Sequence, residues 1–94
     1  MKVITLDNKA HDLCAMIEGF FSDMVLYPIT DPNKFSFRVG ADVYHVAVED
    51  RTLELYHASD SPLIVVNKTR TSEFIRLAYK EIKNNRAKRA LRFN

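Results

Sequence analysis

Three short runs in the middle of the chain alternate apolar and polar residues, and this pattern constrains the fold more than any other feature. They cover residues 35–39, 44–48 and 53–55. A period of two is typical of β-strands that bury only one face. The few residues between the runs favour tight hairpins. The sequence therefore predicts a three-stranded antiparallel meander with one apolar face.

The turns decide which residues of the meander lie side by side. We place two-residue turns at Ala41-Asp42 and Asp50-Arg51. The resulting pairs are Val39–Tyr44, Phe37–Val46 and Phe35–Val48 in the first hairpin, and Val48–Leu53, Val46–Leu55 and Tyr44–His57 in the second. All large apolar groups of these pairs then share one face, which a slip of one residue would disrupt.

Helical patterns flank the strands on both sides. From Lys9 to Val25, apolar residues recur at spacings of three and four, which predicts a helix with Asp7 or Asn8 as its N-cap. A second stripe predicts a helix from Thr69 to about Asn85. We also expect short strands at residues 3–6 and 62–66.

These elements have the order (β)-α-β-β-β-(β)-α, which predicts an α+β fold. We expect a two-layer sandwich, with a three- to four-stranded antiparallel meander and both helices packed on one face. Residues 1–85 form the single domain, and residues 86–94 form a basic extension of the last helix. The expected centre of the core is Phe37, Val46, Leu55, Ile17, Phe21, Phe74 and Ile82.

Over roughly residues 9–85, this order of elements resembles that of double-stranded-RNA-binding domains. The resemblance is one of topology only. The lysine cluster that such domains carry at the start of their last helix is absent, because residues 67–73 read Asn-Lys-Thr-Arg-Thr-Ser-Glu. No family is recognised, and no functional residue is transferred.

The outward face of the meander is the first candidate site. The predicted register aligns Arg38, His45 and Tyr56 in one row, with Glu54 in the next row and Val43 nearby. Such a row offers hydrogen-bond donors for a phosphate or a carboxylate. Two alternatives stand beside this: a solvated face with ordinary cross-strand pairs, and a protein or dimer interface, where Tyr and Arg are enriched.

The charge is unevenly distributed along the chain. The formal net charge of +2 combines about −4 over residues 1–74 with +6 over residues 75–94. The basic residues of the second part are Arg76, Lys80, Lys83, Arg86, Lys88, Arg89 and Arg92. This segment is interpreted as a solvated helix end, a nucleic-acid contact, or a segment that docks on acidic parts of its own or another subunit.

The apolar stripe of the second helix becomes polar at Asn85 and Arg89. We therefore expect the helix to leave the domain near Asn85. Leu91 and Phe93 would give the segment beyond it an apolar handle for docking.

Catalytic and metal motifs are missing from the sequence. It has no P-loop, no Gly-rich dinucleotide motif and no His-Glu-x-x-His motif, so we expect neither a cofactor nor a metal. Cys14 is the single cysteine and lies on an apolar stripe, which indicates a buried hydrophobe in a reducing compartment. No apolar run reaches membrane-spanning length, and we expect a cytoplasmic protein.

These features favour a small non-enzymatic interaction protein that docks on a protein partner or on itself. The alternative is a nucleic-acid-binding regulator that uses the basic helix. An enzyme comes third, because its only plausible group is His45, Arg38, Tyr56 and Glu54, and these would have to surround a cavity.

Overall fold

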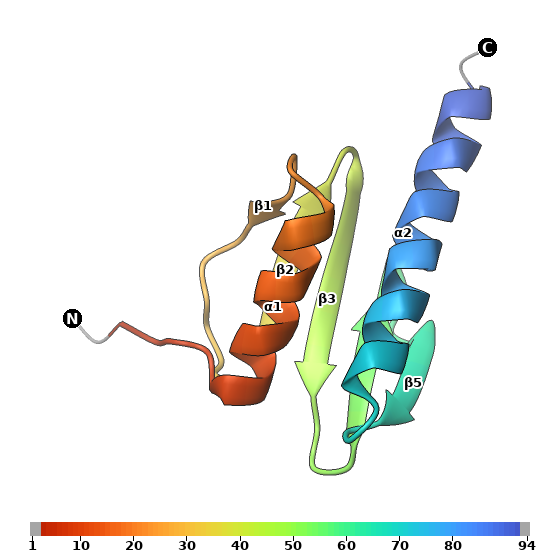
Figure 1. The fold of residues 1–94 in the computed structure, drawn as a ribbon. Coiled ribbons are helices and arrows are strands. Elements are labelled where there is room, and N and C mark those ends of the chain that lie inside the picture. Colours follow the sequence, from red (N-terminus) through yellow and green to blue (C-terminus); the bar gives the residue numbers. More distant parts are fainter. Residues whose placement is uncertain (1–2, 93–94) are drawn as a thin grey trace.

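The structure is a computed structural model that describes residues 3–92 and their side chains as far as Leu91. Two helices flank a five-stranded antiparallel sheet whose strands follow one another in chain order. Both helices pack on the same face of the sheet, α1 over β2 and β3, and α2 over β4 and β5 (Figure 1). The elements are α1 (Asn8–Phe20), β1 (Val25–Leu26), β2 (Lys34–Val39), β3 (Asp42–Val48), β4 (Thr52–Tyr56), β5 (Ile64–Asn67) and α2 (Thr71–Arg92). The predicted α+β sandwich is confirmed.

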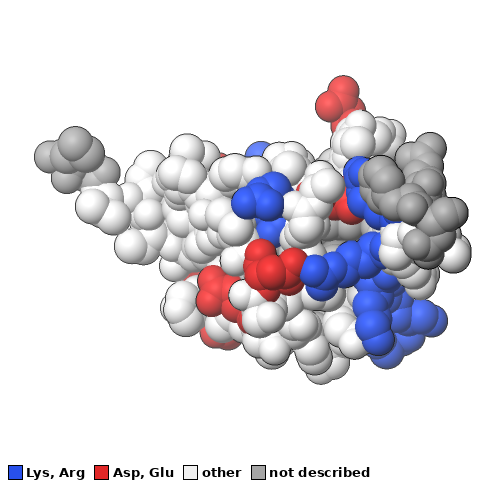
Figure 2. Space-filling view, turned by 90° about the horizontal axis from the view of Figure 1, so that it is seen from above, with Lys and Arg blue, Asp and Glu red and all other residues white. Residues whose placement is uncertain are grey.

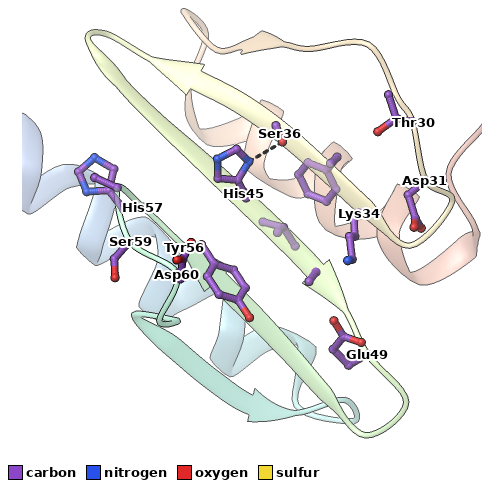
Figure 3. Close-up of a pocket in the computed structure, with 14 residues that line it drawn as sticks. Thr30, Asp31, Lys34, Ser36, His45, Glu49, Tyr56, His57, Ser59 and Asp60 are labelled. Atoms are coloured by element: carbon purple, nitrogen blue, oxygen red, sulfur yellow. Dashed lines mark hydrogen bonds between the residues drawn. The ribbon is translucent and has the colours of Figure 1, made fainter.

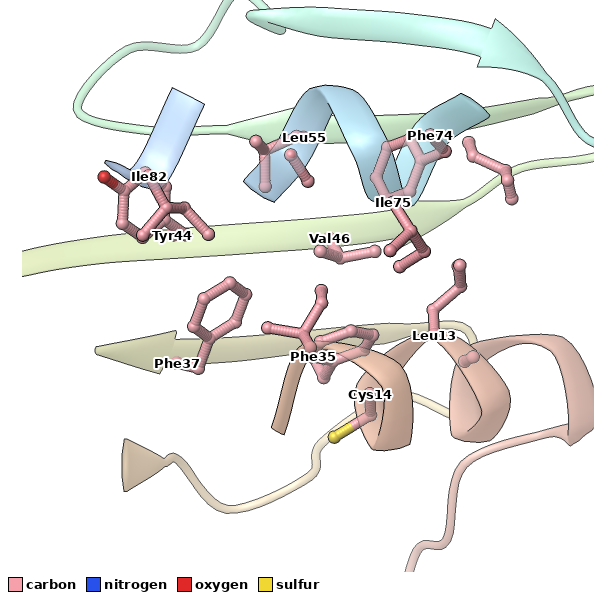
Figure 4. Packing of buried hydrophobic residues seen from close by; sticks show 14 of the residues in the cluster. Leu13, Cys14, Phe35, Phe37, Tyr44, Val46, Leu55, Phe74, Ile75 and Ile82 are labelled. Carbon is pink, nitrogen blue, oxygen red and sulfur yellow. The ribbon is translucent and has the colours of Figure 1, made fainter. Parts of the chain in front are cut away.

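The core lies between the sheet and the two helices (Figure 4). All seven residues expected at its centre are buried, and Phe37 is fully excluded from solvent. The ring of Phe37 stacks on that of Tyr44, with 5.5 Å between their centroids. The alternating pattern of the meander therefore identified the buried face correctly.

The N-terminal part of the chain differs from the prediction. Residues 3–7 form no strand, and α1 ends at Phe20 rather than at Val25. Gly19 weakens the helix at this point. Beyond a turn, Val25 and Leu26 pair with β2 and thus satisfy the backbone of its free edge. Asp7 is the N-cap residue, but its side chain makes no capping hydrogen bond.

The predicted register of the first hairpin is wrong by two residues. Its turn is Gly40-Ala41, so that Val39 pairs with Asp42 and Phe37 with Tyr44. Gly40 has a φ of +61°, the left-handed conformation that the first position of a type II′ turn requires. A shift of two keeps every side chain on its predicted face, which is why the core was still identified.

The second hairpin has the predicted register, with Val48 opposite Leu53 and Val46 opposite Leu55. Two further boundaries moved. The predicted strand at residues 62–66 is β5 at Ile64–Asn67, and α2 continues through Asn85 to Arg92.

Phe37→Ala should lower the free energy of unfolding by about 3–5 kcal/mol, because it removes a fully buried ring from the centre of the core. Urea denaturation followed by circular dichroism measures the change. Met16→Ala is the control, since Met16 lies exposed on α1 and its truncation should cost about 0.5 kcal/mol or less. An unchanged midpoint for Phe37→Ala would contradict this packing.

Candidate functional site

The face of the sheet that points away from both helices, called the outer face below, carries the residues of the first candidate site. Its central row runs from Ser36 through His45 to Tyr56. Arg38 instead lies opposite Val43, and Glu54 lies in the row of Ala47. The predicted row of Arg38, His45 and Tyr56 is therefore wrong, because the first hairpin is shifted by two residues. All five candidate residues still lie on this face.

Polar side chains of the outer face are bonded to one another. Ser36 Oγ lies 2.6 Å from His45 Nδ1, and the hydroxyl of Tyr56 donates to Glu54 Oε1 at 2.5 Å. This bond to the Glu54 carboxylate raises the pKa of Tyr56. Arg38 Nη1 donates to the carbonyl of Gly40 at 2.9 Å, so its guanidinium is held at its own turn. These bonds stabilise the sheet and keep the side chains in place.

A hollow of about 820 Å³ opens over the centre of this face (Figure 3). His45 and Tyr56 line it from the sheet, and two loops close its sides. The charged residues around it are Lys34, Asp31, Glu49 and Asp60, which gives no single sign of charge. Arg38 and Glu54 do not line the hollow. The structure therefore does not place His45, Arg38, Tyr56 and Glu54 around one cavity.

Exposed apolar side chains flank the polar row at both edges of the outer face. Val25 and Tyr27, on and beside β1, are 43% and 37% exposed. Leu63 and Val65, beside and on β5, are 48% and 52% exposed. The first pair was not predicted, because the helical spacing of the sequence extends to Val25. The second pair was hidden in a continuous apolar run, where alternation cannot be recognised.

The basic segment of α2 is divided between two surroundings. Arg76, Lys80 and Lys83 follow one another along an exposed side of the helix, and Lys83 Nζ lies 5.2 Å from the ring centre of Tyr79. Arg86 instead forms an ion pair with Asp23. Figure 2 shows Lys and Arg side chains gathered at one side of this end of the molecule, with an acidic group in contact with them. Lys88 is exposed, and the side chain of Arg92 lies outside the described residues, as does Phe93.

Arg89 reaches a carboxylate that the sheet buries. Asp42, the first residue of β3, is 4% exposed and accepts Arg89 Nε at 2.9 Å and Nη2 at 2.6 Å. His57 Nε2 lies 3.1 Å from the same carboxylate, and the ring of His57 stacks on Tyr44. Asn85 Nδ2 donates to the Tyr44 hydroxyl at 2.9 Å. The polar stripe of α2 therefore packs on the domain, and the prediction that the helix leaves it near Asn85 is wrong.

The hydrogen bonds from Arg89 lower the pKa of Asp42 below its usual range. The carboxylate is therefore held charged in spite of its burial. The helical spacing predicts Arg89 on the buried stripe of α2, but it predicts no partner for its charge. The missing signal was Asp42, which takes the core face only when Gly40 and Ala41 form the turn.

The cysteine and the metal-binding side-chain types give no further candidate site among the described residues. Cys14 is buried, and this burial, together with the neighbouring Glu18 carboxylate, raises the pKa of its thiol to about 11. It is the buried hydrophobe that the sequence predicts. Within residues 3–92, no group of three or more His, Cys, Asp or Glu side chains is arranged to hold a metal ion.

Neither of the described helices combines the length and the apolarity needed to cross a membrane. No protein-family model, curated protein or solved structure matches the chain. The topological resemblance to double-stranded-RNA-binding domains thus rests on element order alone, and the structure adds β1 and β5 to that order.

Asp42→Asn should weaken the fold most at neutral pH, by about 1–3 kcal/mol, because it removes the charge that Arg89 and His57 face. The folded pKa of Asp42 is lowered, so its stabilising effect is present above the unfolded value of about 4 and is lost as the pH falls through the folded value. Below about pH 4 the urea midpoint of the wild type should therefore fall more steeply than that of the variant.

Asp12→Asn serves as the matched control, since this carboxylate is exposed on α1. Its midpoint should follow that of the wild type at every pH. Parallel profiles for Asp42→Asn and the wild type would contradict the importance of the Asp42 contacts.

Proposed function

We propose that the protein is a small non-enzymatic interaction protein, acting in the cytoplasm, that docks on a protein partner or on a second copy through the outer face of its sheet. The observation that supports this most is the position of its exposed apolar side chains. Val25, Tyr27, Leu63 and Val65 border one face, and both helices lie on the other.

The chemistry of the outer face suits a protein interface better than a small ligand. Tyr56 is an aromatic side chain held in place by Glu54, and tyrosine is enriched in interfaces. A rigid aromatic group loses little conformational entropy on binding. The open hollow and its mixed charges fit a polar, hydrated interface with apolar margins.

A second candidate function is nucleic-acid binding by the basic side of α2. The observation that favours it is the exposed row of Arg76, Lys80 and Lys83, because Lys and Arg side chains that contact phosphates release their counterions. Arg86 and Arg89 contribute less to this, because each already has a carboxylate partner on the domain.

The outer-face proposal predicts that Val43→Asp and Tyr56→Ala abolish association, because both lie on the outer face, Val43 opposite Arg38 and Tyr56 opposite His45. Tagged protein would be incubated with an extract of its own cells, and each bound chain would be quantified by mass spectrometry, alongside the molar mass of the pure protein by light scattering. Met16→Asp is the control, since it places the same charge on the exposed side of α1.

Support requires that the same association, with a partner or with itself, is lost with both outer-face variants and kept with Met16→Asp. If no association is lost with both outer-face variants, or if the loss is equal with the control, the proposal is overturned.

The nucleic-acid candidate predicts steep dependence on salt. Retention on duplex DNA or RNA at low salt should fall as salt rises, and each lost phosphate contact should reduce the slope of log K against log salt by about one. Lys80→Glu and Lys83→Glu should abolish retention, whereas Lys34→Glu on the sheet should not. Because Arg89 also stabilises the fold, these point variants test the idea better than deletion of residues 86–94. Absence of retention at low salt would exclude this function.

A further inference from the structure

β5 is the outermost strand on its side of the sheet (Figure 1). It pairs with β4 along one edge, with Leu53 opposite Val66 and Leu55 opposite Ile64. Lys68 continues this register, since its backbone N–H donates to the carbonyl of Arg51 at 2.9 Å. In an antiparallel ladder, hydrogen-bonded pairs alternate with pairs whose backbone groups point away. The backbone N–H and carbonyl groups therefore point toward β4 at Ile64, Val66 and Lys68. At Val65 and Asn67 they point toward the open edge of the sheet.

The backbone groups at this edge can be accounted for one by one. The N–H of Leu63 already donates to Leu55, at 2.8 Å, and the carbonyl of Asn67 already accepts from Arg70, at 2.9 Å. Among the described residues, no partner is found for the N–H and carbonyl of Val65, the carbonyl of Leu63 or the N–H of Asn67. Two donors and two acceptors thus remain on one short segment.

These free groups complement themselves under a two-fold axis. If Val65 faces Val65 of a second, antiparallel copy, the two residues exchange N–H to carbonyl bonds in both directions. The same register sets Asn67 opposite Leu63 of the other copy. There the free N–H of Asn67 meets the free carbonyl of Leu63. This pair leaves out the N–H of Leu63 and the carbonyl of Asn67. Both of these groups are already bonded within each copy.

The side chains of the edge also fit such a pairing. Val65 and Leu63 are about half exposed on the outer face, and the two-fold axis brings the Val65 side chains of both copies together. β5 itself carries no charge and no proline, the usual protections of an exposed edge; Pro62 and Lys68 stand only at its limits. α2 lies on the opposite face from these side chains, over β4 and β5.

We propose that β5 binds β5 of a second copy, antiparallel and centred on Val65, and so joins two sheets into one continuous sheet. This contact goes beyond the proposed function, because it uses the backbone edge of β5, and it should therefore survive Val43→Asp and Tyr56→Ala. The pairing would place the exposed Leu63 and Val65 side chains of the two copies side by side across the two-fold axis. An extended peptide from another protein would use the same free groups, and the experiment separates the two occupants.

The variant that tests this is Val65→Pro. Proline removes the outward N–H and blocks the edge, while the bonds of Ile64 and Val66 to β4 are untouched. Val65→Thr is the matched control, because it keeps the N–H and the branched shape. Light scattering and sedimentation over a range of concentrations should give a monomer–dimer equilibrium for the wild type and Val65→Thr, and a monomer for Val65→Pro with an unchanged circular dichroism spectrum.

Amide hydrogen exchange by NMR gives a second readout that needs no variant. In the wild type at high concentration, the amides of Val65 and Asn67 should be protected, and dilution should remove this protection while those of Ile64 and Val66 keep theirs. This readout holds even if Val65→Pro does not fold.

A wild type that stays monomeric at every accessible concentration would overturn the proposal, as would a dimer whose Val65 and Asn67 amides exchange freely. Protection of these amides by an added extended peptide, in a protein that never dimerises, would assign the edge to a foreign strand instead. In either case a partner that binds the outer face and is lost with Val43→Asp would leave the proposed function standing.

Discussion

A buried carboxylate determines how the C-terminal part of α2 is held against the sheet. Asp42 begins β3 on the core face and is shielded from solvent, where an unpaired charge would be strongly unfavourable. Arg89 supplies the positive charge that it needs, and both Arg89 and His57 supply hydrogen bonds. The last turns of α2 are therefore held against the sheet by a polar contact, at the level where the apolar stripe of the helix has ended. The position of Asp42 at the start of β3 follows from the turn at Gly40.

Alternation in the sequence was enough to predict the meander, its buried face and most of the core. It could not fix the first turn, because registers that differ by two residues bury the same side chains. The left-handed conformation of Gly40 decides between them, and a tertiary structure was needed to show it. The end of α1 was missed for a related reason. Phe20 and Phe21 continue the helical spacing, but pairing of Val25 with β2 competes with further helix.

The sequence predicted correctly that the candidate residues lie on the outer face. It did not predict their cross-strand partners in the first hairpin. His45 lies beside Ser36 instead of Arg38, which removes the anion-binding row that the sequence suggested. The interpretation of the basic segment at residues 75–94 changed more than that of the outer face. Two of its residues, Arg86 and Arg89, neutralise carboxylates of the domain, so part of the charge asymmetry along the chain is cancelled in the fold. A net charge counted along a segment of the sequence therefore overstates the positive charge that its surface presents to a binding partner.

The order of elements also implies an order of assembly. β2, β3 and β4 are joined by tight turns, whereas the two helices meet across most of the chain, as in the bond from Lys9 to Thr71, 62 residues apart. Contacts between near neighbours form sooner, because closing a short loop costs less entropy. α2 follows all five strands in the chain and carries Phe74, Ala78 and Ile82 into the core. Until α2 docks, the apolar face of β4 and β5 is exposed, and a partly folded chain depends on this helix to cover it.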